Sequence, residues 1–577
     1  MRVASRYFPG LSDRRRTALA LLVLVGFSLL IKLFLLSYTV SYNQEAIWLR
    51  DSYYYHSLAL AVMKHGLGTV LRLPGFLPIA QRPIGYPLIL AGIYALAGIK
   101  PMAAILLQVL LSTGTVVLTW LLGRRVLGAP VAFAGALLLC FDPASISSSL
   151  MLMSETSFTF LLMAALALLV SGGSHSAIRT VYRRDTENAE EDSEFSRRAL
   201  RLGGESILRN PHSAIRNLAL AGLLLALAVH IRPVSYYLIP LLALVVFINR
   251  GRSCSAEGAG RKPGTVPVSG TVPEFSPRVS PRFSASRAAG SMLAFLLFPV
   301  LLVGGWQVAK YARSGQAGFN GLGGVNMLFY RGAGALALKQ HRSLQDVQHE
   351  LGFGPSPCRP YSSYFAAHPD AAGLNASALS VRWWNEGLAI VLRHPVETGV
   401  LFLRGAVQQL FDPSSLELGL FCGLDLFWST GEVTRLADRK PGGLLRMVWQ
   451  RYPADAVLMI LCLLYLLGLY VGAAVSLLRL RARKIIGTVP DFPRQTGRGA
   501  ALTLLVGAAF YLLLVSAGPE ASARFRVPMM PILVLLAAAG WQGLDRVGHQ
   551  GYTCSGAGPG RTDPAGRREE NRQQNVV

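Results

Sequence analysis

A series of long apolar segments constrains the fold of this chain more than any other feature of its sequence. A helix needs about 20 mostly apolar residues to cross the ~30 Å hydrocarbon core of a bilayer. Ten segments of roughly that length lie at 17–38, 102–122, 129–148, 153–171, 215–231, 233–249, 291–311, 455–478, 499–517 and 527–545. The sequence therefore predicts an all-α polytopic membrane protein with about ten transmembrane helices.

The overall composition agrees with this class of protein. Only 15% of the 577 residues are charged, against about 25% in ordinary soluble domains. The net charge is +25, but Lys and Arg sit in short clusters beside the apolar segments, so nucleic acid is not a predicted partner. Six Cys in a chain of this length are too few for a disulfide scaffold.

Three basic clusters predict the topology, because cytoplasmic loops carry an excess of Lys and Arg. These clusters lie at 14–16, 124–125 and 479–484. All three clusters lie on the cytoplasmic side only if the apolar stretches 84–98 and 388–411 do not cross the bilayer. We expect these two stretches to lie in the outer interface or to dip in from outside. Both termini are then cytoplasmic.

The apolar segments and polar stretches divide the chain into four parts. Polar inserts at 172–214 and 250–290 have few aromatic residues and no periodicity, so they are expected to be disordered and cytoplasmic. The parts are an N-terminal membrane module at 1–311 that contains both inserts, an extracytoplasmic loop or cap at 312–454, C-terminal transmembrane helices at 455–545 and a disordered cytoplasmic tail at 546–577.

Two acidic residues are predicted on the outer side at membrane depth. From Asp51 onward, the apolar positions Tyr54, Leu58, Ala61 and Val62 follow helical spacing, which favours an amphipathic juxtamembrane helix. Glu155, in SETSFTF, falls at the outer end of a predicted transmembrane segment. A carboxylate at this depth is costly unless it is hydrated or paired, which by default marks a polar cavity. Helix capping is the alternative for either residue.

Arginines are predicted on the same side. Arg82 opens RPIGYPL, Arg232 lies in HIRP, and Arg524 lies in ARFRVP. Arg82 is alternatively a snorkelling anchor, and the other two either snorkel or pair with the acids. Acids and arginines together beside lipid suit sugar transfer from a lipid phosphate to a hydroxyl. A base takes the acceptor proton and cations stabilise the departing phosphate.

Several short motifs, taken in order, resemble one family. They are RDSYYYHSLA, RPIGYPL, GRRVLG, SETSFTFLL, HIRP, RHP and ARFRVPMMP, and they cover most of 15–545 outside the inserts. The chain resembles the GT-C superfamily of membrane glycosyltransferases, specifically bacterial family-39-like enzymes related to protein O-mannosyltransferases and the lipid A aminoarabinose transferase. The resemblance implies the GT-C fold.

The resemblance also implies roles for the site residues. It makes Asp51 the catalytic base, Glu155 a second acid and Arg82 a contact of the donor phosphate. Arg232 and Arg524, on the same side, are further phosphate-binding candidates from their residue type alone. It implies a polyprenyl-phosphate-sugar donor, a lipid, glycan or protein acceptor, and an active site outside a bacterial plasma membrane. No metal and no cofactor are expected.

One departure from the family weakens the case for a protein acceptor. Ser52 follows Asp51 where the protein mannosyltransferases carry an Asp-Glu pair. The alternatives to a transferase are a polyprenyl-linked sugar transporter or flippase and an O-antigen ligase or polymerase. Transporters tend to have repeated halves with broken helices near the midplane, and no such halves are evident.

The positions of the cysteines give one further prediction. Only Cys358 and Cys422 are expected outside, both in the large loop. They are therefore candidates for a disulfide in an oxidising compartment.

Overall fold

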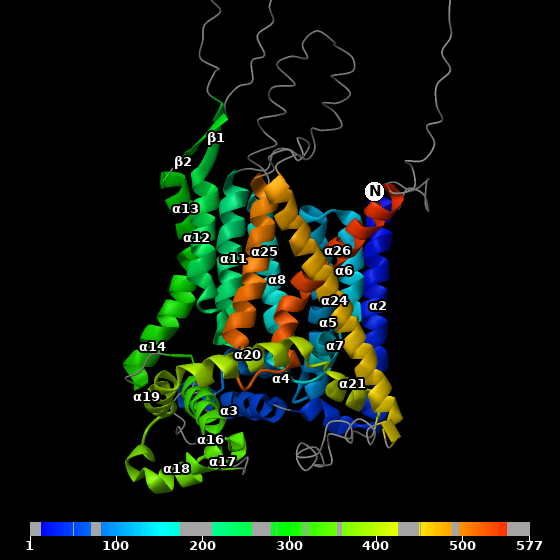
Figure 1. Cartoon of the computed structure of the whole chain (residues 1–577). Coiled ribbons are helices and arrows are strands. Elements are labelled where there is room, and N and C mark those ends of the chain that lie inside the picture. Colours follow the sequence, from blue (N-terminus) through cyan, green and yellow to red (C-terminus); the bar gives the residue numbers. More distant parts are fainter. Residues whose placement is uncertain are drawn as a thin grey trace, which may run out of the picture.

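The structure of the chain is a computed structural model in which helices form a bundle with further helices gathered at one end (Figure 1). It describes residues 13–49, 51–70, 82–173, 211–256, 279–283, 285–314, 318–319, 322–354, 360–424, 449–450, 452–486 and 496–550. Most of the two polar inserts and residues 551–577 of the predicted tail lie outside these ranges.

Nine helices among the described residues are long and apolar enough to cross a membrane, or up to ten if one bent pair counts as a span. This confirms the prediction of an all-α polytopic membrane protein. The helices and helical runs are α2 (Asp13–Tyr42), α5 (Pro101–Val126), α8 (Ser154–Gly173), α11 (Pro211–Ile231), η3 (Pro233–Ser235) with α12 (Leu238–Gly251), α13 (Ala285–Phe298) with the π-helix η4 (Pro299–Gly304) and α14 (Gly305–Ser314), α24 (Pro453–Ile486), α25 (Thr496–Ser516), and η8 (Ala523–Met529) with α26 (Met530–Gln550).

The predicted straight span at 129–148 is wrong in one respect, because the helix breaks inside it. α6 (Ala129–Cys140) and α7 (Pro143–Leu150) meet at an angle of 54°. Pro143 has no N–H to continue the first helix. The side chain of Asp142 accepts a hydrogen bond from the Ser145 N–H and so starts a new helix.

Several helices lie at the end of the bundle where the site is predicted. Figure 1 shows α3 (Ser52–Val70) and α20 (Pro395–Phe411) running across this end, and η1 (Gln44–Trp48) leads into α3. α4 (Gly85–Ala97) has 13 residues, too few to span. The stretches 84–98 and 388–411 are therefore not crossing helices in this structure.

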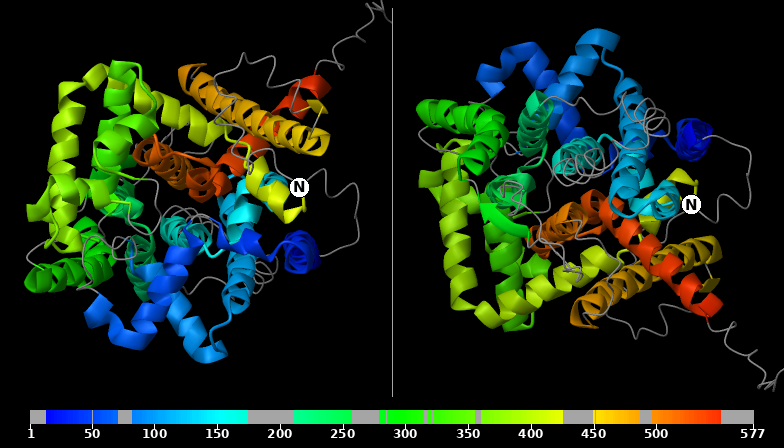
Figure 2. Two further views of the ribbon diagram at one scale, coloured as in Figure 1. Left: turned by 90° about the horizontal axis from the view of Figure 1, so that it is seen from below. Right: turned by 90° about the horizontal axis from the view of Figure 1, so that it is seen from above.

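The predicted cap folds into short helices with an aromatic core of its own. Phe329, Tyr361, Tyr364 and Trp383 are buried together there. Its remaining elements are α15 (Leu322–Val325), the π-helix η5 (Asn326–Gly332), α16 (Ala333–Gln340), α17 (Leu344–Glu350), α18 (Ser362–Ala367), η6 (Pro369–Ala371), α19 (Ala376–Arg393) and α21 (Ser415–Phe421). Figure 2 shows the green helices of the cap along one side of the bundle axis, whereas the yellow α21 lies apart from them and contacts α2 and α24.

The opposite end of the bundle carries the basic clusters. The start of α2 and the ends of α5 and α24 lie there (Figure 1), and Arg124 donates to the Thr17 hydroxyl at 3.0 Å. A hairpin of β1 (Arg252–Ala256) and antiparallel β2 (Val279–Phe283) extends from the same end. The sequence predicted no regular structure in this insert, and the hairpin corrects that prediction for its two strands.

Candidate functional site

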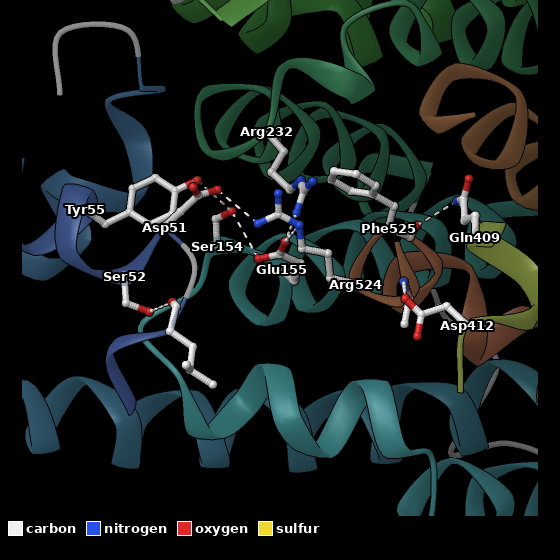
Figure 3. Close-up of polar contacts among 12 residues, drawn as sticks. Asp51, Ser52, Tyr55, Ser154, Glu155, Arg232, Gln409, Asp412, Arg524 and Phe525 are labelled. Atoms are coloured by element: carbon white, nitrogen blue, oxygen red, sulfur yellow. Dashed lines mark hydrogen bonds and ion pairs between the residues drawn. The ribbon is translucent and has the colours of Figure 1, made fainter. Parts of the chain in front are cut away.

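The five predicted site residues come together at the end of the bundle beneath the cap. Asp51 precedes α3, Arg82 precedes α4, Glu155 lies in the first turn of α8, Arg232 joins α11 to η3, and Arg524 lies in η8. Figure 3 shows Arg524 between Asp51 and Glu155, with Arg232 beside them. We refer to these five residues as the carboxylate–arginine cluster.

Each carboxylate in the cluster is paired with a guanidinium group. Asp51 accepts from Arg82 Nη2 at 3.0 Å and from Arg524 Nη1 at 3.0 Å, one bond to each oxygen. Glu155 Oε1 lies 2.5 Å from Arg232 Nη1 and 3.9 Å from Arg524 Nε. Arg524 therefore bridges the two acids. The alternative that both acids merely cap helices is wrong.

The two acids differ in their access to solvent. The side chain of Asp51 is 17% exposed, and those of its partners Arg82 and Arg524 are 16% and 22% exposed. The side chain of Glu155 is only 1% exposed. Asp51 and its arginines are therefore open to a bound molecule, whereas Glu155 is buried.

The charges around Asp51 determine its protonation. Burial by itself would raise the pKa of the Asp51 carboxyl group, but the guanidinium groups of Arg524 and Arg82 outweigh that effect and hold the pKa below its ordinary value. Asp51 is thus ionised at neutral pH. While both arginines contact it, it is also a weaker base than a free carboxylate.

Aromatic rings and hydroxyl groups hold the charged side chains in place. The Arg82 guanidinium lies 4.8 Å from the centre of the Tyr54 ring, and the Phe525 ring lies 5.1 Å from Arg232 and 4.8 Å from Arg524. Such cation–π contacts restrict where a guanidinium can point. Neither Tyr54 nor Phe525 was predicted as a site residue, although Phe525 stands between two arginines in the ARFR motif.

A short hydroxyl chain completes the cluster. The Tyr55 and Ser154 hydroxyl groups lie 3.3 Å apart, and Ser154 donates to Glu155 Oε2 at 3.4 Å. These contacts link α3 to the start of α8 (Figure 3).

A glycine explains why Arg82 and Arg232 are neighbours. A Cβ atom at Gly85 would lie only 2.5 Å from the backbone carbonyl of His230. Only glycine allows the start of α4 to lie this close to the end of α11. The RPIGYPL and HIRP motifs are therefore adjacent in space, although about 150 residues separate them in sequence.

Two further charged residues lie inside the bundle and were not predicted. Lys32 of α2 is 1% exposed and donates to the Ser28 hydroxyl at 2.6 Å. Asp142 is fully buried and accepts from the backbone N–H of Ser145 at 2.8 Å and from its hydroxyl. We refer to Lys32 and Asp142 as the internal charges.

Other predictions concern metals and cysteines. Within the ranges that the structure describes, no group of three or more His, Cys, Asp or Glu residues is placed to hold a metal ion. Cys422 is half-buried and bonds to none of the described cysteines. Its predicted partner Cys358 lies outside the described residues, so that pairing remains a prediction.

Part of the chain that carries the cluster is similar in sequence to a known family. Residues 81–180 match the family described as dolichyl-phosphate-mannose-protein mannosyltransferase. The matched stretch includes Arg82 and Glu155. Over residues 81–180 this match confirms the resemblance to protein mannosyltransferases that the motifs predicted. No curated protein sequence matches the chain.

Three solved structures illustrate the structural likeness. The oligosaccharyltransferase AglB from Archaeoglobus fulgidus, in complex with an inhibitory peptide and a dolichol-phosphate, is 10% identical, with 93% of this chain and 52% of AglB covered at a TM-score of 0.40. The chain thus spans about half the length of AglB. ArnT from Cupriavidus metallidurans is 14% identical. The match to ArnT in the apo state covers 86% of this chain and 73% of ArnT, with a TM-score of 0.29. The match to ArnT bound to undecaprenyl phosphate covers 91% of this chain and 78% of ArnT, with a TM-score of 0.28.

Proposed function

We propose that this chain is a membrane glycosyltransferase that moves a sugar from a polyprenyl-phosphate-sugar donor to an acceptor hydroxyl on the extracytoplasmic face of a bacterial plasma membrane. One observation carries the proposal. Three arginines from three distant segments converge on two carboxylates at one end of a membrane bundle. That arrangement supplies a base and phosphate ligands at the depth where a lipid headgroup lies.

The donor phosphate has good ligands in this cluster. Arginine suits a phosphate because its planar guanidinium donates two parallel hydrogen bonds and does not lose its proton. Arg82, Arg524 and Arg232 are all partly exposed, at 16%, 22% and 17% of their side chains, and Arg232 is held by the buried Glu155 rather than by Asp51. When the sugar–phosphate bond breaks, the phosphate gains negative charge, so the same arginines stabilise the transition state more than the bound donor.

Donor binding would also activate the base. While they contact Asp51, the guanidinium groups of Arg524 and Arg82 hold its pKa low against the effect of burial. A phosphate that draws these arginines toward itself removes that influence, so the pKa of Asp51 rises toward its ordinary value. The carboxylate then becomes available to the acceptor hydroxyl only when the donor is in place.

The chemical step follows from these assignments. The acceptor oxygen attacks the anomeric carbon from the side opposite the phosphate, and its proton passes to Asp51. The bond between the anomeric carbon and the phosphate oxygen breaks, and polyprenyl phosphate leaves with the electron pair. A single displacement of this kind inverts the anomeric configuration. Glu155 keeps Arg232 in place throughout.

A transfer assay on the purified full-length protein tests the proposal. The protein is incubated with a panel of radiolabelled polyprenyl-phosphate sugars and with envelope lipid and glycan acceptors, and NMR determines the anomer of the product. We expect release of polyprenyl phosphate and an inverted product. Movement of intact donor across proteoliposomes without cleavage would favour a transporter, and a retained anomer would exclude single displacement.

A labelling experiment tests the orientation in the membrane. A Cys introduced at Tyr53, which is 64% exposed on α3, should react with an impermeant maleimide in intact cells. Reaction only after the membrane has been opened would place the cluster on the cytoplasmic side.

A further inference from the structure

The segment that carries Arg524 is bound on its other side to the C-terminal end of α20. Arg526 is fully buried, and its Nη1 donates to the backbone carbonyl oxygens of Gln409, Leu410 and Asp412 at 2.9, 2.8 and 3.0 Å. The last carbonyl groups of a helix lack partners within the helix, and a cation near them is favourable. Arg526 therefore caps α20 from a different part of the chain.

Side chains at the C-terminal end of α20 also form hydrogen bonds with the backbone of η8. Asp412 Oδ2 accepts from the backbone N–H of Ala523 at 2.9 Å, and Gln409 Nε2 donates to the Phe525 carbonyl at 3.1 Å. Figure 3 shows Gln409 and Asp412 beside Phe525, on the side away from Asp51. The residues on either side of Arg524 are thus both hydrogen-bonded to α20.

The turn before η8 makes further contacts with the same region. Arg331 of η5 forms an ion pair with Glu520 at 3.2 Å and lies over the Phe402 ring of α20. A Cβ atom at Gly405 of α20 would overlap the backbone of Gly518. Contacts on both sides of Arg524 therefore hold residues 518–526 against α20 and the cap.

We propose that Arg526 is a positioning residue that fixes Arg524 in the carboxylate–arginine cluster by locking η8 to the C-terminal end of α20. Within the described residues, Arg526 Nε and Nη2 are buried and have no hydrogen-bond partner, which is unfavourable for stability. We therefore assign Arg526 a role in the position of η8 rather than in the stability of the fold. Its three carbonyl contacts determine where η8 begins, and hence where Arg524, two residues earlier, points.

A double-mutant cycle tests this role. It rests on the proposed function, because its readout is sugar transfer per folded molecule. Glutamine at position 526 cannot reach three carbonyl groups, so we expect Arg526→Gln to lower kcat by about 10²-fold, as for a displaced catalytic group. Arg526→Lys should retain part of the activity. In an Arg524→Ala background the Arg526→Gln substitution should have little further effect. Equal losses in both backgrounds would show that Arg526 does not act through Arg524.

A second measurement does not depend on activity. Hydrogen-exchange mass spectrometry of peptides covering 518–530 should show faster exchange in Arg526→Gln and in the milder variant Asp412→Ala. The matched control is Arg479→Gln, which also removes an arginine-to-carbonyl hydrogen bond, to Gly540 at 3.0 Å, but from α24 to α26 nearer the other end of the bundle. It should leave both exchange at 518–530 and turnover unchanged.

The two experiments separate the two proposals. If the wild-type protein cleaves no donor while Arg526→Gln speeds exchange at 518–530, the proposed function fails and the locking of η8 stands. If the wild-type protein transfers sugar but exchange and turnover are unchanged in Arg526→Gln and Asp412→Ala, the positioning role is overturned.

Discussion

Asp142 and Glu155 lie 13 residues apart, and each stands where a helix begins, yet their partners are very different. Asp142 bonds to Ser145, three residues away, and so terminates one helix and starts another. Glu155 pairs with Arg232 of a different helix and lies near Arg524. An acid with a local partner shapes the backbone, whereas an acid with distant cationic partners helps to assemble a site.

The same contrast separates the internal charges from the carboxylate–arginine cluster. Lys32 and Asp142 are sealed inside the bundle and bonded to hydroxyl groups and a backbone amide. Asp51, Arg82 and Arg524 are each partly exposed and bonded to one another. Charged groups that can exchange partners with a ligand must be reachable; Asp51, Arg82 and Arg524 meet that condition, whereas Lys32 and Asp142 do not.

The largest effect should come from the exposed acid of the cluster. Asp51→Asn keeps the shape of the side chain but removes its basicity, so kcat should fall by ~10²-fold or more while the protein still folds. Turnover is measured on purified protein, with folding checked by thermal unfolding. Near-normal turnover would end the assignment of Asp51 as the base.

Arg82→Ala should have the next largest effect. Loss of a group that stabilises the departing phosphate typically lowers kcat by about 10²–10³-fold, and Arg82→Lys should restore part of it. A passive interfacial anchor would instead give less protein with unaltered turnover per molecule. An undiminished kcat would remove Arg82 from the site.

Glu155→Gln should have a smaller effect on turnover, because Glu155 is buried and contacts Arg232, so in the proposed mechanism it affects the reaction only through that arginine. We expect a fall of about 10-fold, which corresponds to roughly 1.4 kcal/mol of transition-state stabilisation. The melting temperature should also fall, since the buried partner of Arg232 is lost. A loss as large as that of Asp51→Asn would instead place Glu155 in direct contact with the reacting groups.

The pH dependence of kcat/KM should report the arginines around Asp51. The ionised base is present above its pKa, and activity is lost as the pH falls through that value. Arg524 and Arg82 lower the pKa of Asp51 in the free enzyme, so Arg524→Ala should move the acid limb to higher pH. An acid limb that stays in place would mean that another group governs it.

The smallest effect on turnover is expected from the internal charges. Asp142→Ala removes a helix cap, which should lower the free energy of unfolding by about 1 kcal/mol and leave kcat per folded molecule unchanged. A clear loss of kcat in stable Asp142→Ala protein would show that the distinction between the two regions is wrong.

Sequence alone predicted most of the fold, because membrane spans depend on length and hydropathy within one segment. It also identified the five members of the cluster, because charged residues at membrane depth are costly and therefore rare, so each one is a candidate site residue. It did not predict the break at Asp142-Pro143, which depends on a side-chain hydrogen bond within an otherwise apolar stretch. Nor did it predict Arg526, whose partners are backbone carbonyl groups more than 100 residues away.

The composition of the carboxylate–arginine cluster has a consequence for its overall charge. Three cations face two anions, so the side chains of the cluster together have an excess of one positive charge, which the phosphodiester of the proposed donor would neutralise. In the proposed reaction, Asp51 then takes a proton and the phosphate monoester approaches two negative charges. The sum of charges is then again close to zero. Because imbalance is most costly where water is scarce, a cluster of this composition suits the donor and the product equally well and disfavours an uncharged lipid at the same place.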